Sequence, residues 1–156
     1  GGGVPTAFLS TSANEYAGRL SPDGRAMAYT SDESGRPEVY VQRFPSGGDK
    51  IQISTQGGSE PQWRGDGKAL FFVGASRALT EVSIAPDSRL TAGRPTKVFD
   101  SIVDTSPGTI HAFHYAVSAD GQHFFVDVTT DNAAPTNVVL NWQSALAAAQ
   151  GKAGSR

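Results

Sequence analysis

The pair Asp-Gly, followed by a polar residue and a run of apolar residues, occurs three times in this chain of 156 residues. The copies are SPDGRAMAYT from Ser21, RGDGKALFFV from Arg64 and SADGQHFFVD from Ser118. Their aspartates lie 43 and then 54 positions apart. A unit that returns at such intervals limits the fold more than any single motif, because each copy must adopt the same local structure.

Each copy is flanked by further segments that are typical of short β-strands. One strand precedes each turn (YAGRL, SEPQW and FHYAV), and another follows a polar loop (PEVYVQRF, ALTEVSI and TNVVLNW). A fourth strand follows in the first two units, KIQIST and PTKVFD. The 43-residue interval matches the length of a four-stranded propeller blade. We therefore predict an all-β fold, a β-propeller of about three four-stranded blades. A β-sandwich is the alternative, but it does not explain the interval.

The expected strands form one propeller segment over residues 1–156, with an incomplete ring. Its parts are an outer strand of a preceding or partner blade at 5–10, blades at 16–55 and 59–100, a blade lacking its outer strand at 112–142, and a C-terminal tail at 143–156. Closed propellers need roughly four to eight blades. Two completions are open. Earlier blades are missing from this fragment, or a homodimer completes a six-bladed ring, with half of the ring from each chain.

The turns have a specific chemistry. In SPDG, Pro22 and Asp23 suit the central positions of a type I turn, and Gly24 suits the left-handed conformation of the bulge that follows. The expected structural turn residues are the repeated pairs Asp23 and Gly24, Asp66 and Gly67, Asp120 and Gly121. The tripeptide Arg64-Gly65-Asp66 is also the pattern of a cell-adhesion ligand. Turn geometry already explains it, and the other two copies lack the arginine.

Composition and motifs exclude several functions. The 13 Lys and Arg against 15 Asp and Glu give a net charge of −2, so no nucleic-acid partner is expected. Cysteine is absent, and no run of about 18 apolar residues occurs, so we expect no disulfide and no membrane insertion of this segment. The sequence does not match the phosphate-loop, nucleophile-elbow or kinase motifs, so we expect no catalytic residue and no cofactor. His111, His114 and His123 lack the supporting ligands of a zinc site, so no metal is expected.

The loops at one end of the propeller are the expected recognition face, because binding residues usually lie on loops held by a rigid scaffold. The candidates are polar residues of these loops: Asn14, Glu15, Asp32, Glu33, Arg36, Glu60, Arg77, Asp104 and His111. The expected partner is a protein or peptide, or a small ligand. For Asp32 and Glu33 with Arg36 and Glu38, a solvated turn with a local ion pair is the competing interpretation.

The ordered series of segments resembles a known family. SPDGR and SDESGRPEVYVQRF look like the TolB-type, WD-repeat-like propeller motif. GGSEPQWRGDGKALFF, YAVSADGQHFFV and NVVLNWQSAL resemble the C-terminal propeller of bacterial membrane-anchored serine/threonine kinases and related transcriptional regulators. The likeness covers about residues 13–146, with Gly65 and Ala119 in place of the usual proline.

This resemblance implies a non-catalytic sensor or protein-interaction domain of a bacterial signalling protein, the C-terminal part of a serine/threonine kinase. It also implies a periplasmic or other extracytoplasmic location, with a cytoplasmic one left open. Similar propellers precede the hydrolase domain of prolyl oligopeptidase-like peptidases or form the body of free-standing TolB-like envelope proteins. These two are the alternative functions.

Overall fold

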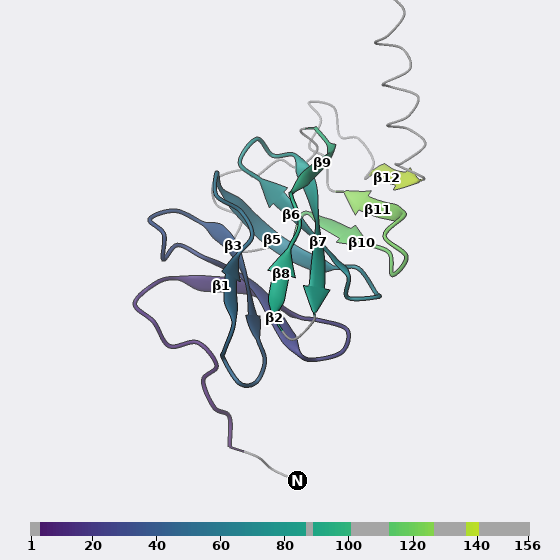
Figure 1. Ribbon diagram of the computed structural model, residues 1–156. Coiled ribbons are helices and arrows are strands. Elements are labelled where there is room, and N and C mark those ends of the chain that lie inside the picture. Colours follow the sequence, from purple (N-terminus) through teal and green to yellow (C-terminus); the bar gives the residue numbers. More distant parts are fainter. Residues whose placement is uncertain (1–3, 87–88, 101–112, 127–136, 141–156) are drawn as a thin grey trace, which may run out of the picture.

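Three antiparallel β-sheets follow one another along the chain in the computed structural model (Figure 1). The structure describes residues 4–86, 89–100, 113–126 and 137–140. All regular elements within these ranges are strands, which agrees with the predicted all-β class.

The first sheet contains β1 (Glu15–Leu20), β2 (Ala26–Ser31), β3 (Glu38–Arg43) and β4 (Lys50–Gln52), paired in chain order. All three pairings are antiparallel. Beyond β4, the amide of Ile53 donates to the carbonyl of Val39 at 2.8 Å and continues the ladder. These strands fall on the segments that the first repeat predicts.

The second sheet contains β5 (Gly58–Trp63), β6 (Ala69–Gly74) and β7 (Leu79–Pro86), with two short strands along its outer edge. The predicted outer strand is present as β9 (Thr96–Phe99), which pairs with the first half of β7. The sequence did not predict β8 (Leu90–Ala92), which pairs with the second half of β7. Its three residues are too few to show an alternating pattern.

The third sheet contains β10 (Tyr115–Val117), β11 (His123–Val126) and β12 (Asn137–Leu140), again antiparallel in chain order. Within the described residues this sheet has three strands. The predicted tail at 143–156 lies outside the described residues.

The outer strand predicted at residues 5–10 is not formed in this chain. Phe8 of this segment instead lies against Phe44, with ring centroids 5.0 Å apart in an edge-on arrangement. A strand exists only where a neighbour supplies hydrogen-bond partners. The prediction assigned this segment to a preceding or partner blade, and the described residues contain no such blade.

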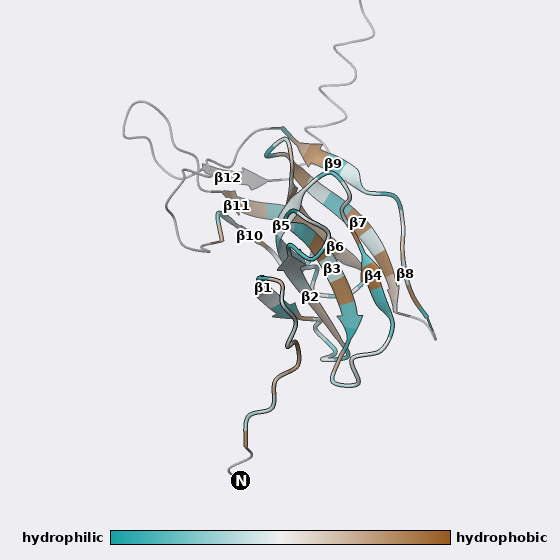
Figure 2. Ribbon diagram, turned by 90° about the vertical axis from the view of Figure 1, so that its left-hand side faces the viewer, coloured by the Kyte–Doolittle hydropathy of each residue, from teal (hydrophilic) through white to brown (hydrophobic). Residues whose placement is uncertain are grey.

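The core consists of two apolar layers, one on each face of the second sheet. Along β6, Leu70 and Phe72 face the first sheet, where they meet residues such as Val39 and Val41. Phe71 and Val73 face the third sheet and meet residues such as Phe124. Figure 2 shows hydrophobic residues concentrated in the strands and hydrophilic ones in the connecting loops. Burial of β6 on both faces explains its continuous apolar run.

The three turns have the predicted geometry. Gly24, Gly67 and Gly121 have φ of 69°, 69° and 72°, in the left-handed region. Each glycine amide donates to the carbonyl three residues earlier, at 2.8 Å for Gly24 and 2.9 Å for the other two. Each turn aspartate accepts the backbone amide two residues later, at 2.9 to 3.1 Å.

Neighbouring turns also contact each other, and Gly65 of the Arg-Gly-Asp tripeptide makes the closest approach. Its amide donates to the carbonyl of Ala119 at 2.8 Å, and an added Cβ would lie 2.7 Å from that oxygen. Arg64 forms ion pairs with Asp66 at 2.9 Å and with Glu81 at 3.3 Å. The tripeptide is therefore held within the fold by contacts to the third sheet and to its own sheet.

The left-handed glycines can be tested by a pair of alanine substitutions. A Cβ on Gly24 or on Gly48 would meet nothing within 4 Å among the described residues, but only Gly24 has a positive φ. Gly24→Ala should therefore destabilise the protein by about 1 kcal/mol through backbone strain alone. Gly48→Ala should leave stability unchanged or raise it by less than about 1 kcal/mol. Urea unfolding of both variants measures this difference, and equal midpoints would refute the bulged-turn geometry.

The turn aspartates predict a loss of stability in acid. Hydrogen bonds lower the pKa of Asp23 (mainly from Ser21), Asp66 (mainly from Arg64) and Asp120 (mainly from Ser118) below the ordinary value of 3.8. A carboxylate with a lowered native pKa stabilises the fold above its ordinary pKa, and this contribution disappears as the pH falls through the native pKa. The stability difference between the wild type and a triple Asp→Asn variant should therefore shrink as the pH falls below about 4. Thermal unfolding across this range gives the test, and a difference independent of pH would contradict it.

Candidate recognition site

The predicted recognition residues that the structure describes lie at one end of the sheets, which we call the loop end. It comprises the start of β1, residues 32–37 between β2 and β3, residues 53–57 between β4 and β5, and residues 75–78 between β6 and β7. The three Asp-Gly turns lie at the opposite end, the turn end. Asn14, Glu15, Asp32, Glu33, Arg36 and Arg77 are at the loop end, and Glu60 lies next to it in the first half of β5, whereas Asp104 and His111 lie outside the described residues.

Asn14 and Asp32 join the entry of the first sheet to the loop after β2. The Asn14 amide and side-chain Nδ2 donate to the two Asp32 carboxylate oxygens at 2.9 and 2.6 Å. These bonds lower the pKa of the Asp32 carboxyl, with the side-chain bond as the larger cause. Beside them, the Thr11 hydroxyl donates to Glu15. The segment before β1 is thereby fixed to the β2–β3 loop.

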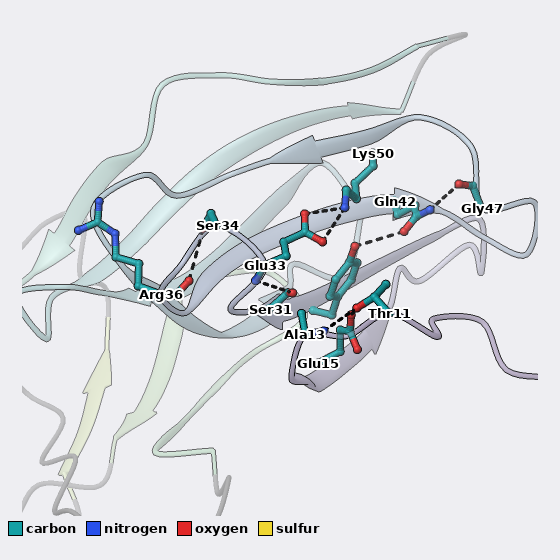
Figure 3. A network of polar contacts seen from close by, with 11 residues as sticks. Thr11, Ala13, Glu15, Ser31, Glu33, Ser34, Arg36, Gln42, Gly47 and Lys50 are labelled. Carbon is teal, nitrogen blue, oxygen red and sulfur yellow. Dashed lines mark hydrogen bonds and ion pairs between the residues drawn. The ribbon is translucent and has the colours of Figure 1, made fainter.

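Glu33 and Lys50 form an ion pair on the surface of the first sheet (Figure 3). The Lys50 Nζ lies 2.5 and 2.7 Å from the two Glu33 oxygens, and the Glu33 amide donates to the Ser31 hydroxyl at 3.2 Å. Both charged side chains are partly exposed. A pair of this kind contributes about 1 kcal/mol or less.

The turn at residues 33–37 is exposed and Arg36 pairs with Glu38, as the interpretation of a solvated turn with a local ion pair expects, but the Glu38 side chain is only 1% exposed. Its oxygens accept from Arg36 Nε at 3.0 Å, from the Gly57 amide at 2.8 Å and from the Ser54 hydroxyl. Arg36 also donates to the carbonyl of Thr55 at 3.0 Å. The carboxylate therefore ties the third strand of the first sheet to the connection that leads into the second sheet. Nothing in the local sequence distinguishes Glu38 from a surface glutamate.

Glu60 is also buried, and it joins the second sheet to the third. The His114 amide donates to Oε2 at 2.8 Å, and His114 Nδ1 lies 2.8 Å from Oε1. The Tyr115 hydroxyl donates to the carbonyl of Glu60 at 2.8 Å. Burial, then the charges of Glu60 and Asp32, raise the pKa of Tyr16 on β1. Glu60 in the first strand of the second sheet thus contacts both His114 and Tyr115 at the start of the third.

Ala17, Glu60 and His114 hold the same place in the three repeats, six residues before the turn aspartate. Ala17 and Glu60 have φ of 55° and 57°, and the strand pairing shifts register around each of them. Such a backbone conformation costs on the order of 1 kcal/mol in a residue other than glycine and often marks a functional site. The repeat itself locates this position, but it does not predict the contact between Glu60 and His114.

The chemistry of the loop end is that of fixed polar groups. Within the described ranges, no group of three or more His, Cys, Asp or Glu side chains is placed to hold a metal ion. Among those same residues no helix is long and apolar enough to cross a membrane. The carboxylates of Glu38 and Glu60 are both occupied by hydrogen bonds from the chain itself.

Comparison with known proteins identifies the fold. No family model and no curated protein matches the chain. TolB from Acinetobacter baumannii has a similar structure, with a TM-score of 0.58 and 18% identity over 82% of this chain and 30% of TolB. A proposed 6-phosphogluconolactonase from Bacteroides uniformis is also similar, with a TM-score of 0.50 and 14% sequence identity. The match covers 85% of this chain and 42% of that protein. This chain spans less than half the length of either protein, and it is a β-propeller segment with a TolB-like fold.

An alanine substitution at Glu60 tests its contact with His114 without adding backbone strain, because Ala17 shows that alanine adopts the same φ at the equivalent position. Glu60→Ala should destabilise the protein by about 1–3 kcal/mol, since the buried His114 amide loses its acceptor. Glu33→Ala, which removes a partly exposed ion pair, should cost about 1 kcal/mol or less. Glu60→Gln should lower the pKa of Tyr16 toward its ordinary value of 10.0. Denaturant unfolding and NMR titration of the tyrosine rings test both statements, and equal losses in the two alanine variants would contradict the role of Glu60.

Proposed function

We propose that this chain is a non-catalytic recognition segment of a bacterial signalling protein, and that its loop end binds a protein or peptide. The observation that carries this proposal is the contact of Glu60 in the second sheet with His114 and Tyr115 at the start of the third, beside the polar loops at one end of a rigid scaffold. Residues held by the scaffold in this way are preorganised, which lowers the entropy lost when a partner binds.

The engagement of the buried carboxylates supports a non-catalytic role. A general base must reach the proton that it removes from a substrate. The two Glu60 oxygens instead contact the amide and the ring of His114, and the Glu38 oxygens contact Arg36, Ser54 and Gly57. These contacts fix the connections between sheets and leave the surrounding loops to determine what binds.

The link to a signalling protein rests on the ordered segments that resemble the C-terminal propeller of membrane-anchored serine/threonine kinases. In such a protein this segment would be extracytoplasmic and would report a bound partner to a kinase domain elsewhere in the chain. The TolB-like fold is compatible with this role, and fold alone assigns no partner.

Selection of a random peptide library against the full chain tests the proposal. We expect selected peptides to shift the NMR signals of Asn14, Asp32, Glu33 and Arg36. Asp32→Asn should lower the affinity of the chain for the selected peptides about tenfold, the usual loss for a charge-assisted contact. The matched control is Asp49→Asn in the β3–β4 loop at the turn end, which should leave affinity unchanged. Failure to select any peptide, or equal losses in both variants, would refute a recognition function of the loop end.

A further inference from the structure

A depression of about 440 Å³ lies beside β10, which is an edge strand of the third sheet. We call it the inner-strand groove, because its lining comes mainly from the first strands of all three sheets. Its lining includes Arg19 of β1, Gln62 of β5, Phe113 and His114 ahead of β10, Ala116 of β10 and Phe125 of β11.

Arg19 supplies a positive charge to this groove. Its guanidinium carbon lies 4.0 Å from the centre of the Phe113 ring, and the indole Nε1 of Trp63 donates to its carbonyl at 3.0 Å. No carboxylate of the described residues forms an ion pair with Arg19, whereas Arg36, Arg43 and Arg64 each have such a partner. Arg19 is exposed, and its guanidinium lies over the Phe113 ring, where it is available to an anion.

His114 adds a second polar group with a defined orientation. Its Nδ1 lies 2.8 Å from the Glu60 carboxylate, which fixes the orientation of the ring at the groove. Gln62 is held in the groove as well, since its side-chain amide donates to the carbonyl of Tyr115.

Phe125 gives the groove an apolar wall. It lies opposite Ala116 in the pairing of β10 with β11, and its side chain is 53% exposed. Its neighbours Phe124 and Val126 are buried against the second sheet. The groove thus combines one exposed cation with an aromatic surface, which matches a ligand that carries one negative charge beside an apolar group.

We infer that the inner-strand groove binds the C-terminal carboxylate of a peptide whose last side chain is apolar, with Arg19 as the carboxylate ligand and Phe125 against the apolar side chain. This inference rests on the proposed recognition function and adds a second peptide site beside the loop end. A planar guanidinium pairs with a carboxylate through two parallel hydrogen bonds. A phosphate dianion fits less well, because the Glu60 carboxylate lies behind His114.

The probes are acetyl-Ala-Ala-Ala-Phe as the free acid, the same peptide as its C-terminal amide, and the free acid ending in Gly. Their dissociation constants for the full chain are measured by NMR titration. We expect the Phe acid to bind about tenfold more tightly than its amide, as for the gain of a charge-assisted pair. The Gly acid should also bind more weakly. The amide removes the only carboxylate of the probe, so the first comparison measures the contribution of the C-terminal charge, and the Gly acid measures that of the last side chain.

Matched variants test whether Arg19 causes the preference for the acid over the amide. Arg19→Gln should abolish the preference for the acid over the amide, and Arg19→Lys should retain part of it. Arg25→Gln removes the same charge from an exposed arginine at the turn end and should leave the preference unchanged. A wild-type chain that binds acid and amide equally, or a preference that survives Arg19→Gln, would overturn the inference. A different outcome is that peptides shift the NMR signals of Asn14, Asp32 and Arg36 and bind equally well as acid and as amide. In that case the proposed function stands and the assignment of the groove fails.

Discussion

The rest of the structure depends on the burial of one sheet between two others. Each side chain of β6 from Leu70 to Val73 is buried, alternately toward the first sheet and toward the third. If one face of this antiparallel sheet were exposed to solvent, polar residues would alternate with apolar ones along this strand. With both faces covered, neighbouring sheets can only stack, and the first strand of each comes to lie beside the first strand of the next. The contact of Glu60 with His114 and Tyr115 follows from this stacking.

Buried carboxylates fix how the stacked sheets connect. The hydrophobic effect is non-directional, so sheets held together only by apolar layers would have no fixed position relative to one another. Glu38 binds the connection from the first sheet to the second, and Glu60 binds the start of the third sheet. A buried carboxylate is costly unless its oxygens are satisfied, and these two are satisfied only in one arrangement of the sheets. They therefore specify position, while the apolar layers supply most of the stability.

The sequence predicts those features that depend on local chemistry. Asp23 and Gly24 predict their turn because the aspartate accepts nearby amides and the glycine tolerates a positive φ, and both effects act within a few residues. The bond from His114 to Glu60 joins residues 54 positions apart, and its existence depends on how two sheets stack. Glu38 was missed for the same reason, since its burial comes from the chain that follows β4. Phe125 is exposed because the described residues cover only the opposite face of β11, where Phe124 and Val126 are buried.

The repeat also separates residues required for folding from residues available for recognition. At the turn end the three copies keep Asp and Gly, because the backbone conformation demands them. Six residues earlier the same backbone position holds Ala17, Glu60 and His114, so the fold does not require one side chain there. Four residues before the turn aspartate the copies hold Arg19, Gln62 and Ala116, so the arginine stands in only one of them. Ala17 and Glu60 share a positive φ that His114 lacks, so the copies differ in backbone as well as in side chain at this position. The repeat leaves these positions free to vary, and the proposed recognition function would make use of them.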